Sequence, residues 1–275
     1  MSMNDGEYNG SEIDRVVDAV RKTSKYRHVC EDLIRNIGAR ELSGQGKYRE
    51  ALKSTKSKLH QVCGAYFVKR PDYGRWLIEL KEAKQIGGER AFKGKCAEIM
   101  GFHYSTRERL TLLDSFYSRI FSLLPPVRSV LDVACGFNPL SIPWMPSSGA
   151  LTYHACDVYH DMVDFLNEYM DIISVEGETK VRDVAQYPPE IQADLALVLL
   201  TIPCLEQVDR SAGTRLLESL NARHLAVSFP VRTIGGREKD MRRFYSGRFH
   251  SMVEGRGWET SRLDFDTELV FLIHR

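Results

Sequence analysis

The chain has 275 residues, of which 43% are apolar and 27% are charged, and its formal net charge at pH 7 is +1. This composition is typical of a folded globular protein and excludes the disordered and fibrous classes. No apolar run approaches the ~20 residues that cross a bilayer, and the first ten residues lack the basic-then-apolar order of a signal peptide, so the sequence predicts a cytoplasmic protein with no membrane partner.

The first part of the chain is predicted to be helical and basic. Between residues 11 and 124, apolar residues recur three and four positions apart, which predicts a series of helices. Residues 1–105 hold 20 Lys and Arg against 14 Asp and Glu, whereas residues 106–275 hold 18 against 23. We therefore predict a basic helical domain over residues 1–105 and a second domain over residues 106–275.

The basic bias is strongest between residues 43 and 75. On the helix expected after Ser43, an apolar stripe can pack while a neighbouring stripe carries Arg49, Lys53 and Lys56. The apolar stripe consists of Tyr48, Leu52, Thr55, Leu59, Val62 and Tyr66. A basic cluster attracts a polyanion, because each phosphate contact releases counterions. A solvated helix face presents the same pattern, so the charges alone leave both interpretations open.

A further helix is expected over residues 106–124, because the Pro-Pro pair that follows cannot continue it. Ser105 or Thr106 would cap its first turn. Arg107 has a different use, since a guanidinium near a cofactor loop pairs bidentately with a carboxylate ligand. A plain surface arginine is the alternative interpretation.

Beyond this helix, short apolar strands alternate with helical stretches, which is the pattern of a doubly wound parallel sheet. The expected strands cover residues 128–133, 151–156, 194–200, 224–229, 258–265 and 268–274, with one more before Asp183. Only Asp266 and Thr267 separate the last two, so these strands must pair antiparallel. We predict an α/β fold of the class I methyltransferase (Rossmann-like) type, with a seven-stranded sheet, a terminal antiparallel hairpin and a preceding helical domain.

The loop after the first strand carries a cofactor signal. Ser129-Val-Leu-Asp-Val-Ala-Cys-Gly136 runs into Phe137-Asn-Pro-Leu140 and an expected helix. Small residues at Ala134 and Gly136 let the backbone turn tightly and approach a ligand where open α/β sheets bind one. The loop lacks the G-x-G-x-x-G of dinucleotide folds and the G-x-x-x-x-G-K-[ST] of phosphate loops. It instead resembles motif I of enzymes that use S-adenosylmethionine.

Two acidic residues follow later strands. Asp157 lies about one β-α-β unit after Asp132, where a carboxylate can accept hydrogen bonds from both hydroxyls of a ribose. Asp183 follows the expected third strand, where its carboxylate can accept a hydrogen bond from the amino group of adenine while Val184 packs on the adenine ring. Helix capping is the alternative role for either aspartate. Their joint placement favours ligand binding.

The cysteines indicate neither a metal site nor a disulfide framework. Six are spread along the chain with no C-x-x-C pair, namely Cys30, Cys63, Cys96, Cys135, Cys156 and Cys204. Zinc sites and disulfide scaffolds use closer, repeated spacings. We therefore expect reduced, mostly buried thiols.

Four motifs together carry a family resemblance: His103-Tyr-Ser-Thr-Arg-Glu-Arg109, Leu131-Asp-Val-Ala-Cys-Gly-Phe-Asn-Pro-Leu140, Ile202-Pro-Cys-Leu-Glu-Gln207 and Ser228-Phe-Pro-Val-Arg-Thr-Ile-Gly-Gly-Arg237. From about residue 43 to its end, the chain resembles the Arm/Rmt group of aminoglycoside-resistance 16S rRNA methyltransferases. The resemblance implies methyl transfer from S-adenosylmethionine to guanine N7 in the decoding site of assembled 30S subunits. It also implies that the helical domain docks on 16S rRNA, and that the loop after Phe229 lies near the target base. We further expect a monomer.

The residues and the resemblance together give an expected site. The expected cofactor-binding residues are Tyr66, Tyr104, Ser105, Thr106, Arg107, Ala134, Gly136, Asp157, Asp183, Val184, Leu199 and Gln207. The expected RNA-binding residues are Arg49, Lys53, Lys56, Lys69, Arg70, Arg75, Arg237 and Met241. The family motif commonly continues Gly-Gly-Arg-x-x-Gly-Met, and this chain departs from it with Asp240 in place of the last glycine.

Guanine N7 carries an in-plane lone pair and no proton, so it can attack a sulfonium methyl group without a general base. Catalysis then reduces to positioning the reactants and holding an extruded base, and we expect no catalytic acid or base. Phe102, Tyr104, Phe244 and Tyr245 are candidates for stacking on that base, although aromatic residues more often belong to a core.

Two alternatives remain at this stage. Cys204 follows a proline after the fourth parallel strand, as the nucleophile of cytosine-C5 methyltransferases does, and that chemistry needs a thiolate. No second cysteine motif lies at a suitable position downstream. The other alternative is a non-catalytic rRNA-binding or assembly protein with a degenerate cofactor fold. The intact set of Asp132, Gly136, Asp157 and Asp183 argues against it.

Overall fold

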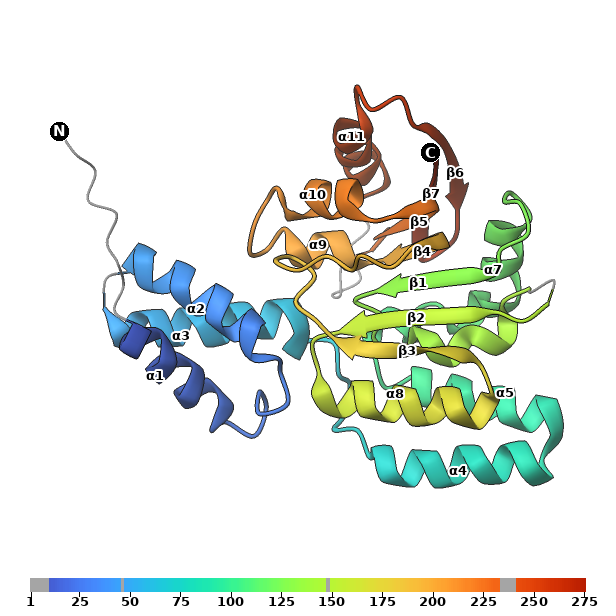
Figure 1. Ribbon diagram of the computed structural model, residues 1–275, viewed down its shortest axis with the longest axis horizontal. Helices are drawn as coiled ribbons and strands as arrows, with labels where there is room; N and C mark the ends of the chain where they lie inside the picture. The colour runs from blue at the N-terminus through green and yellow to red at the C-terminus, as the bar shows by residue number, and fades with distance from the viewer. Residues whose placement is uncertain (1–9, 46, 147–148, 233–240) are drawn as a thin grey trace.

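The computed structural model describes residues 10–45, 47–146, 149–232 and 241–275. Seven strands form one mixed sheet in the order β3-β2-β1-β4-β5-β7-β6 (Figure 1). They are β1 (Ser129–Val133), β2 (Thr152–Asp157), β3 (Glu176–Val181), β4 (Ala193–Leu199), β5 (Ala222–Pro230), β6 (Glu259–Asp264) and β7 (Glu268–His274). The first five pair in parallel, and β7 pairs antiparallel with β5 and β6. The predicted sheet and terminal hairpin are confirmed.

Helices precede and flank the sheet. Before it come α1 (Gly10–Arg21), α2 (Glu31–Gln45), α3 (Tyr48–Leu59) with a π-helical extension (His60–Gly64), α4 (Tyr73–Ile86), α5 (Gly88–Met100), α6 (Tyr104–Arg107) and α7 (Leu113–Phe121). Between the strands lie α8 (His160–Ile173), α9 (Thr201–Leu205), α10 (Ala212–Ser219) and α11 (Met241–Val253). The predicted helical character of the first part of the chain is therefore confirmed.

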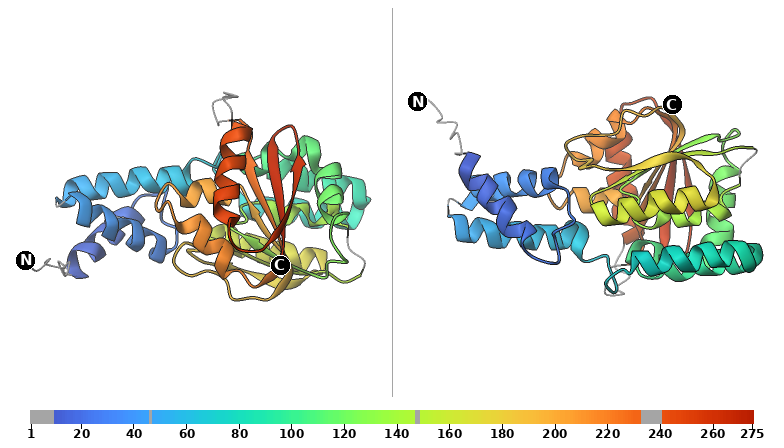
Figure 2. Two further views of the ribbon diagram at one scale, coloured as in Figure 1. Left: turned by 90° about the horizontal axis from the view of Figure 1, so that it is seen from above. Right: turned by 60° about the horizontal axis from the view of Figure 1, so that its bottom comes forward.

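Both faces of the sheet are covered. α4, α5 and α8 lie on one side, and α9, α10 and α11 on the other (Figures 1 and 2). Along β4, Leu195 and Leu197 belong to the first apolar core, whereas Ala196 and Val198 belong to the second. Strand side chains alternate between the faces, so burial on both faces explains why this strand is an uninterrupted apolar run in the sequence.

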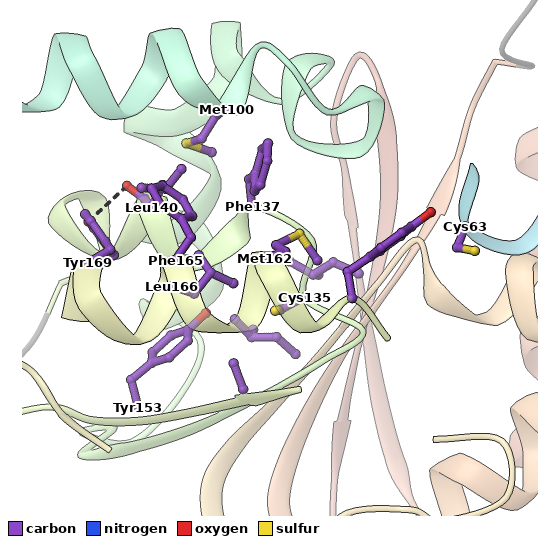
Figure 3. Packing of buried hydrophobic residues seen from close by; sticks show 14 of the residues in the cluster. Cys63, Met100, Cys135, Phe137, Leu140, Tyr153, Met162, Phe165, Leu166 and Tyr169 are labelled. Atoms are coloured by element: carbon purple, nitrogen blue, oxygen red, sulfur yellow. Dashed lines mark hydrogen bonds between the residues drawn. The ribbon is translucent and has the colours of Figure 1, made fainter. Parts of the chain in front are cut away.

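The loop after β1 is anchored from behind by the first core. Phe137 lies close to residues of α5 and α8 (Figure 3). Its ring centroid is 5.7 Å from that of Trp76 on α4 and 6.1 Å from that of Phe165 on α8. Tyr169 of α8 donates a hydrogen bond to the carbonyl oxygen of Leu140 at 3.4 Å. These contacts fix the loop on its inner side and leave its outer side for a ligand.

Helices α1 to α3 form a separate lobe at the carboxyl ends of β1, β2 and β3 (Figure 1). Its interior is continuous with the first core, since Ile34, Ile37 and Leu59 belong to the same apolar cluster as Phe137. Helix α4, in contrast, packs against α8. The boundary at residue 105 therefore separates helical from α/β sequence, whereas in space α4 and α5 group with the sheet.

The expected helix over residues 106–124 is wrong in its continuity. α6 ends at Arg107, a 3-10 turn covers Leu110–Leu112, and α7 begins only at Leu113. The backbone N–H of Arg109 donates to Thr106, a 3-10 rather than an α-helical hydrogen bond. This change of pitch turns the Arg109 side chain into the core, where it is 1% exposed.

The expected helix caps also differ from the structure. The residue that precedes α6 is His103, and Thr106 instead donates from Oγ1 to the carbonyl oxygen of Met100. The helix expected after β1 is present as a 3-10 helix, Asn138–Trp144. Pro143, inside this helix, lacks the N–H group that an α-helix would use there, whereas Pro139 lies in the first turn, where proline is tolerated.

Within the described ranges, no helix combines the length and apolar character needed to cross a bilayer. Nor do the described residues include a cluster of three His, Cys, Asp or Glu side chains suited to a metal ion. All six cysteines are free, and only Cys204 is not fully buried.

Candidate functional site

The loop after β1 contains left-handed backbone conformations at two positions. Ala134 has a φ of 53° and Gly136 a φ of 52°. Non-glycine residues rarely adopt this region, so Ala134 is a strained position. A Cβ atom on Gly136 would lie 3.0 Å from the ring of His103. The sequence expectation that small residues are needed here therefore has a direct steric cause.

Asp157, at the end of β2, holds this loop in place. One of its oxygens accepts the N–H of Gly136 at 2.9 Å, and the other accepts the N–H of Val158 at 2.7 Å. Burial raises the pKa of this carboxyl group, which is only 8% exposed. The backbone N–H of Tyr159 also donates to this carboxylate. A carboxylate has about four acceptor positions, so acceptor capacity remains for a hydroxyl group of a ligand. The helix-cap alternative is wrong, because the residue before α8 is Tyr159.

Asp183, after β3, is oriented by two amide donors. Its Oδ1 accepts the N–H of Ala185 at 3.1 Å, and its Oδ2 accepts the side-chain amide of Asn36 at 3.2 Å. Burial raises the pKa of this carboxyl group as well. Asn36 belongs to α2, so the amino-terminal lobe supplies a donor to a carboxylate of the sheet domain.

Both aspartates line one cavity at the carboxyl edge of the sheet. Its floor comes from the loops after β1 to β4, and its outer wall comes from the lobe through Leu33, Val62, Cys63 and Tyr66. The remaining lining residues of the sheet domain include Ala134, Gly136, Tyr159, Arg182, Val184, Leu199, Thr201 and Cys204. Thus the lobe and the sheet enclose the cavity together.

The lining chemistry fits S-adenosylmethionine. A nucleoside needs acceptors for its ribose hydroxyls and adenine amine, and two buried carboxylates face the same cavity. Val184 and Leu199 provide apolar surface for a base, and the sterically required Gly136 allows close backbone approach. Asp157 would hold the ribose and Asp183 the adenine.

A second, more open cavity adjoins the first. The two share four lining residues, namely Tyr66, Ser105, Leu200 and Cys204. The second cavity is further lined by His60, Gln61, Ala65, Tyr104, Glu108, Pro203, Gln207, Pro230, Arg232, Met241 and Tyr245. Ligands bound in the two cavities would therefore face each other across this shared wall.

The expected cofactor residues divide among the two cavities. Eight line the first cavity, namely Tyr66, Ser105, Ala134, Gly136, Asp157, Asp183, Val184 and Leu199. Tyr104 and Gln207 line only the second. Thr106 is buried inside α6, and Arg107 is exposed to solvent. Neither of these two lines either cavity, and the pairing of Arg107 with a cofactor carboxylate stays a prediction.

The expected RNA-binding residues are spread over a surface rather than gathered in one pocket. Arg49 and Lys53 are exposed on α3, and Lys56 is half-buried. Lys69 and Arg70 line a separate hollow beside the loop between α1 and α2. Arg75 is engaged with Glu79 at 2.6 Å. Met241 lines the second cavity, and Arg237 lies outside the described residues, as does Asp240.

Of the aromatic candidates for base stacking, two line the second cavity. Tyr104 and Tyr245 are on its wall. Phe102 packs on Trp76 at 4.9 Å between ring centroids and belongs to the core. Phe244 is 62% exposed and lines neither cavity. Of the four candidates for stacking on the target base, Tyr104 and Tyr245 therefore remain.

The sequence analysis missed a buried polar network beneath the site. Arg109 pairs bidentately with Glu268 of β7, at 2.7 and 3.0 Å, and donates to Asn138 at 2.7 Å. Asn138 in turn donates to Asp132 at 2.9 Å. Asp132 thus shapes the loop rather than lining a cavity, and burial raises its pKa to about 6. A signal was present in Glu268, an acid that begins an otherwise apolar strand.

Cys204 lies on the shared wall as a thiol rather than a thiolate. Burial raises its pKa to about 11, and its Sγ is 2.8 Å from the hydroxyl of Tyr66. A thiol with this pKa is almost entirely protonated at neutral pH, so it is a poor nucleophile. The cytosine-C5 alternative is therefore not supported by the site.

Comparisons with known proteins agree with this geometry. The family model described as ribosomal RNA methyltransferase (FmrO) matches residues 22–272. Over 265 residues the chain is 33% identical to a 16S rRNA (guanine(1405)-N(7))-methyltransferase of Micromonospora rosea, covering 96% of this chain and 97% of that protein. A protein of the same name from Frankia casuarinae is 35% identical over 266 residues, covering 96% and 94% of the two chains.

The structure of the chain is also similar to solved structures. The 16S rRNA methyltransferase RmtF in complex with S-adenosyl-L-homocysteine has a TM-score of 0.80 and 29% identity, covering 100% of both chains. The 16S rRNA methylase RmtB has a TM-score of 0.77 and 28% identity, covering 96% of this chain and 98% of that one.

Proposed function

The chain belongs to the FmrO family of ribosomal RNA methyltransferases, and on that premise we propose that it methylates guanine N7 in the decoding site of 16S rRNA within the assembled 30S subunit. S-adenosylmethionine supplies the methyl group. Methylation there would protect the ribosome from aminoglycosides and confer resistance. A 30S substrate also explains why residues 1–105 hold more basic than acidic residues. With such a substrate, we propose a cytoplasmic location.

One observation carries the proposal: the cavity with two buried carboxylates shares a wall with a second, open cavity. Methyl transfer needs donor and acceptor in line and in contact, with water excluded. Tyr66, Ser105 and Leu200 border both cavities, so they are placed to separate the two ligands except at the point of transfer. Tyr104 and Tyr245 would hold the extruded base.

No side chain is required to move a proton from N7. His103 is nearby, but burial and the positive charge of Arg109 lower its pKa to about 3, so it is neutral at physiological pH. Its Nδ1 is 2.7 Å from the hydroxyl of Ser105, which it helps to orient. The residues of the site therefore act by positioning.

The direct test is methylation of purified 30S subunits by the full-length chain, with labelled S-adenosylmethionine, followed by mapping of the modified nucleotide. We expect one N7-methylguanine in the decoding site of 30S subunits and much slower labelling of naked 16S rRNA. Modification of an adenine, or of 50S subunits in preference to 30S, would refute the proposal.

The basic surface gives a prediction for substrate docking. Replacing Lys53 and Arg70 by glutamate should lower 30S affinity and reduce the dependence on salt by about one slope unit per lost phosphate contact. Cofactor affinity should not change, since neither residue lines the cofactor cavity. Binding is measured at two salt concentrations, with Glu259→Lys on the exposed edge strand β6 as a control. Wild-type affinity at both concentrations would rule out this docking surface.

Cys204→Ser should leave the enzyme largely active, because lone-pair attack by N7 needs no thiolate. The hydroxyl keeps a polar partner for Tyr66, which lies 2.8 Å from Sγ. The measurement is single-turnover methylation of 30S subunits, with thermal unfolding as a check on folding. Complete loss of transfer in a folded variant would restore the nucleophilic role of this cysteine.

A further inference from the structure

Glu108 occupies a distinctive place in the second cavity. It directly follows α6, is partly buried and lines the second cavity but not the first. Among the described lining residues of that cavity it is the only carboxylate. It therefore lines the second cavity without contributing to the cofactor cavity, from which a methyl group would come.

The Glu108 carboxylate has no hydrogen bond or ion pair within the part of the chain that the structure describes, although its backbone N–H donates to Tyr104. Neighbouring acids are engaged directly: Glu206 accepts from Arg248 at 3.0 Å, and Glu268 holds Arg109. Burial, followed by the charge of Glu268, raises the pKa of Glu108, while Arg232, Arg107 and Arg109 act in the opposite direction. A partly buried carboxylate that faces a cavity has acceptor positions that a bound ligand can use.

The proposed reaction determines which donors a bound guanine would present. Its N7 must face the shared wall, because the methyl group comes from the cofactor cavity. The N1–H and 2-amino groups lie on the Watson–Crick edge of the base, away from N7. That edge then faces the part of the second cavity that does not border the first.

We propose that Glu108 accepts hydrogen bonds from N1–H and the 2-amino group of the target guanine and so selects guanine over adenine. This inference rests on the proposed function. Adenine has no hydrogen at N1 and no 2-amino group, so it would place a lone pair against the carboxylate. A site that pairs with donor groups discriminates strongly against a ligand that lacks them, because its buried acceptor is left unsatisfied.

The test removes the proposed hydrogen bonds in two ways, by changing the base and by changing Glu108. Single-turnover methylation is measured on 30S subunits reconstituted with guanosine or inosine at the target position, since inosine differs from guanosine only by lacking the 2-amino group. We expect the wild type to methylate inosine subunits ~10- to 100-fold more slowly, the range of one charge-assisted hydrogen bond. Glu108→Ala should methylate guanosine subunits more slowly than the wild type. Its rates on guanosine and inosine subunits should agree to within about twofold, because the variant and the inosine substitution remove the same interaction.

Both enzymes meet the same subunits, so any effect of inosine on the rRNA itself cancels in the comparison. Glu108→Ala should bind S-adenosylmethionine with wild-type affinity, because Glu108 does not line the cofactor cavity. Glu259→Gln, an exposed acid on β6, is the matched control and should keep the full preference for guanosine. If the alanine variant fails to fold, Glu108→Gln keeps the side-chain volume and should reduce that preference several-fold.

An alanine variant that slows both substrates equally and keeps the inosine penalty would overturn the inference, because Glu108 would then act only on the structure. The absence of any inosine penalty in the wild type would overturn it too. Failure of the wild type to methylate guanosine subunits would instead refute the proposed function itself, so the two failures are distinguishable.

Discussion

Asp157→Ala is expected to lower the affinity for S-adenosylmethionine at least 100-fold. Each hydrogen bond to a charged group contributes ~1.5–3 kcal/mol, and we propose that Asp157 accepts two from the ribose. The same change also releases the N–H groups of Gly136 and Val158, which the carboxylate holds at 2.9 and 2.7 Å. Calorimetric titration of the folded variant with the cofactor measures the effect.

Asp194 provides a matched control. It too is a carboxylate that accepts two backbone N–H groups, those of Arg128 and Ser129 at 2.9 and 3.1 Å, but at the amino end of β1. Asp194→Ala should therefore cost stability without changing cofactor affinity. The 30S affinity of Asp157→Ala should stay near that of the wild type. Unchanged cofactor affinity in Asp157→Ala would contradict the proposal that Asp157 binds the ribose of the cofactor.

Glu268→Gln should destabilise the fold by ~3–5 kcal/mol, as expected when one partner of a buried ion pair is removed. Arg109 is 1% exposed and Glu268 0%, so a charge left alone there has no access to water. The ion pair links the segment after α6 to β7 and, through Asn138, to the loop after β1. Urea unfolding, analysed as a two-state transition, gives the free energy of unfolding.

The surface ion pair of Arg262 and Asp264 tests whether burial causes the large loss of stability expected for Glu268→Gln. These side chains are 2.7 Å apart but are 42% and 49% exposed. Exposed pairs contribute ~0–1 kcal/mol, so Arg262→Ala should have a small effect. Replacing Arg109 by methionine and Glu268 by leucine together should recover much of the stability lost in Glu268→Gln. A loss below ~1 kcal/mol in Glu268→Gln would contradict the assigned importance of the buried pair.

The sheet could be predicted from the sequence because strand signals are local. Apolar runs bounded by turns mark the strands, and the short gap at Asp266 and Thr267 dictates an antiparallel hairpin. Asp157 and Asp183 could be found for the same reason, since the carboxyl ends of parallel strands converge at one edge. Position along a strand was enough to bring these two residues to one cavity.

The remaining features depend on contacts between distant segments. Asn36 reaches Asp183 across 147 positions, and Arg109 reaches Glu268 across 159. Helical periodicity predicts that α4 has an apolar face but not that α8 covers it. Similarly, the pattern around α6 cannot tell which of Arg107 and Arg109 turns inward, because the 3-10 turn that follows α6 changes the phase of the helix.

The wall that joins the two cavities has a consequence for inhibition. Tyr66 and Leu200 border both sites, so a single molecule could enter the first cavity with a nucleoside group and extend past them with a purine in the second. The second group of such a molecule binds at the effective concentration set by its linker, so a short, stiff linker multiplies the two affinities. If the proposed function holds, a bisubstrate compound of this kind would compete with cofactor and ribosome at once, and would restore susceptibility to the antibiotic without touching the ribosome.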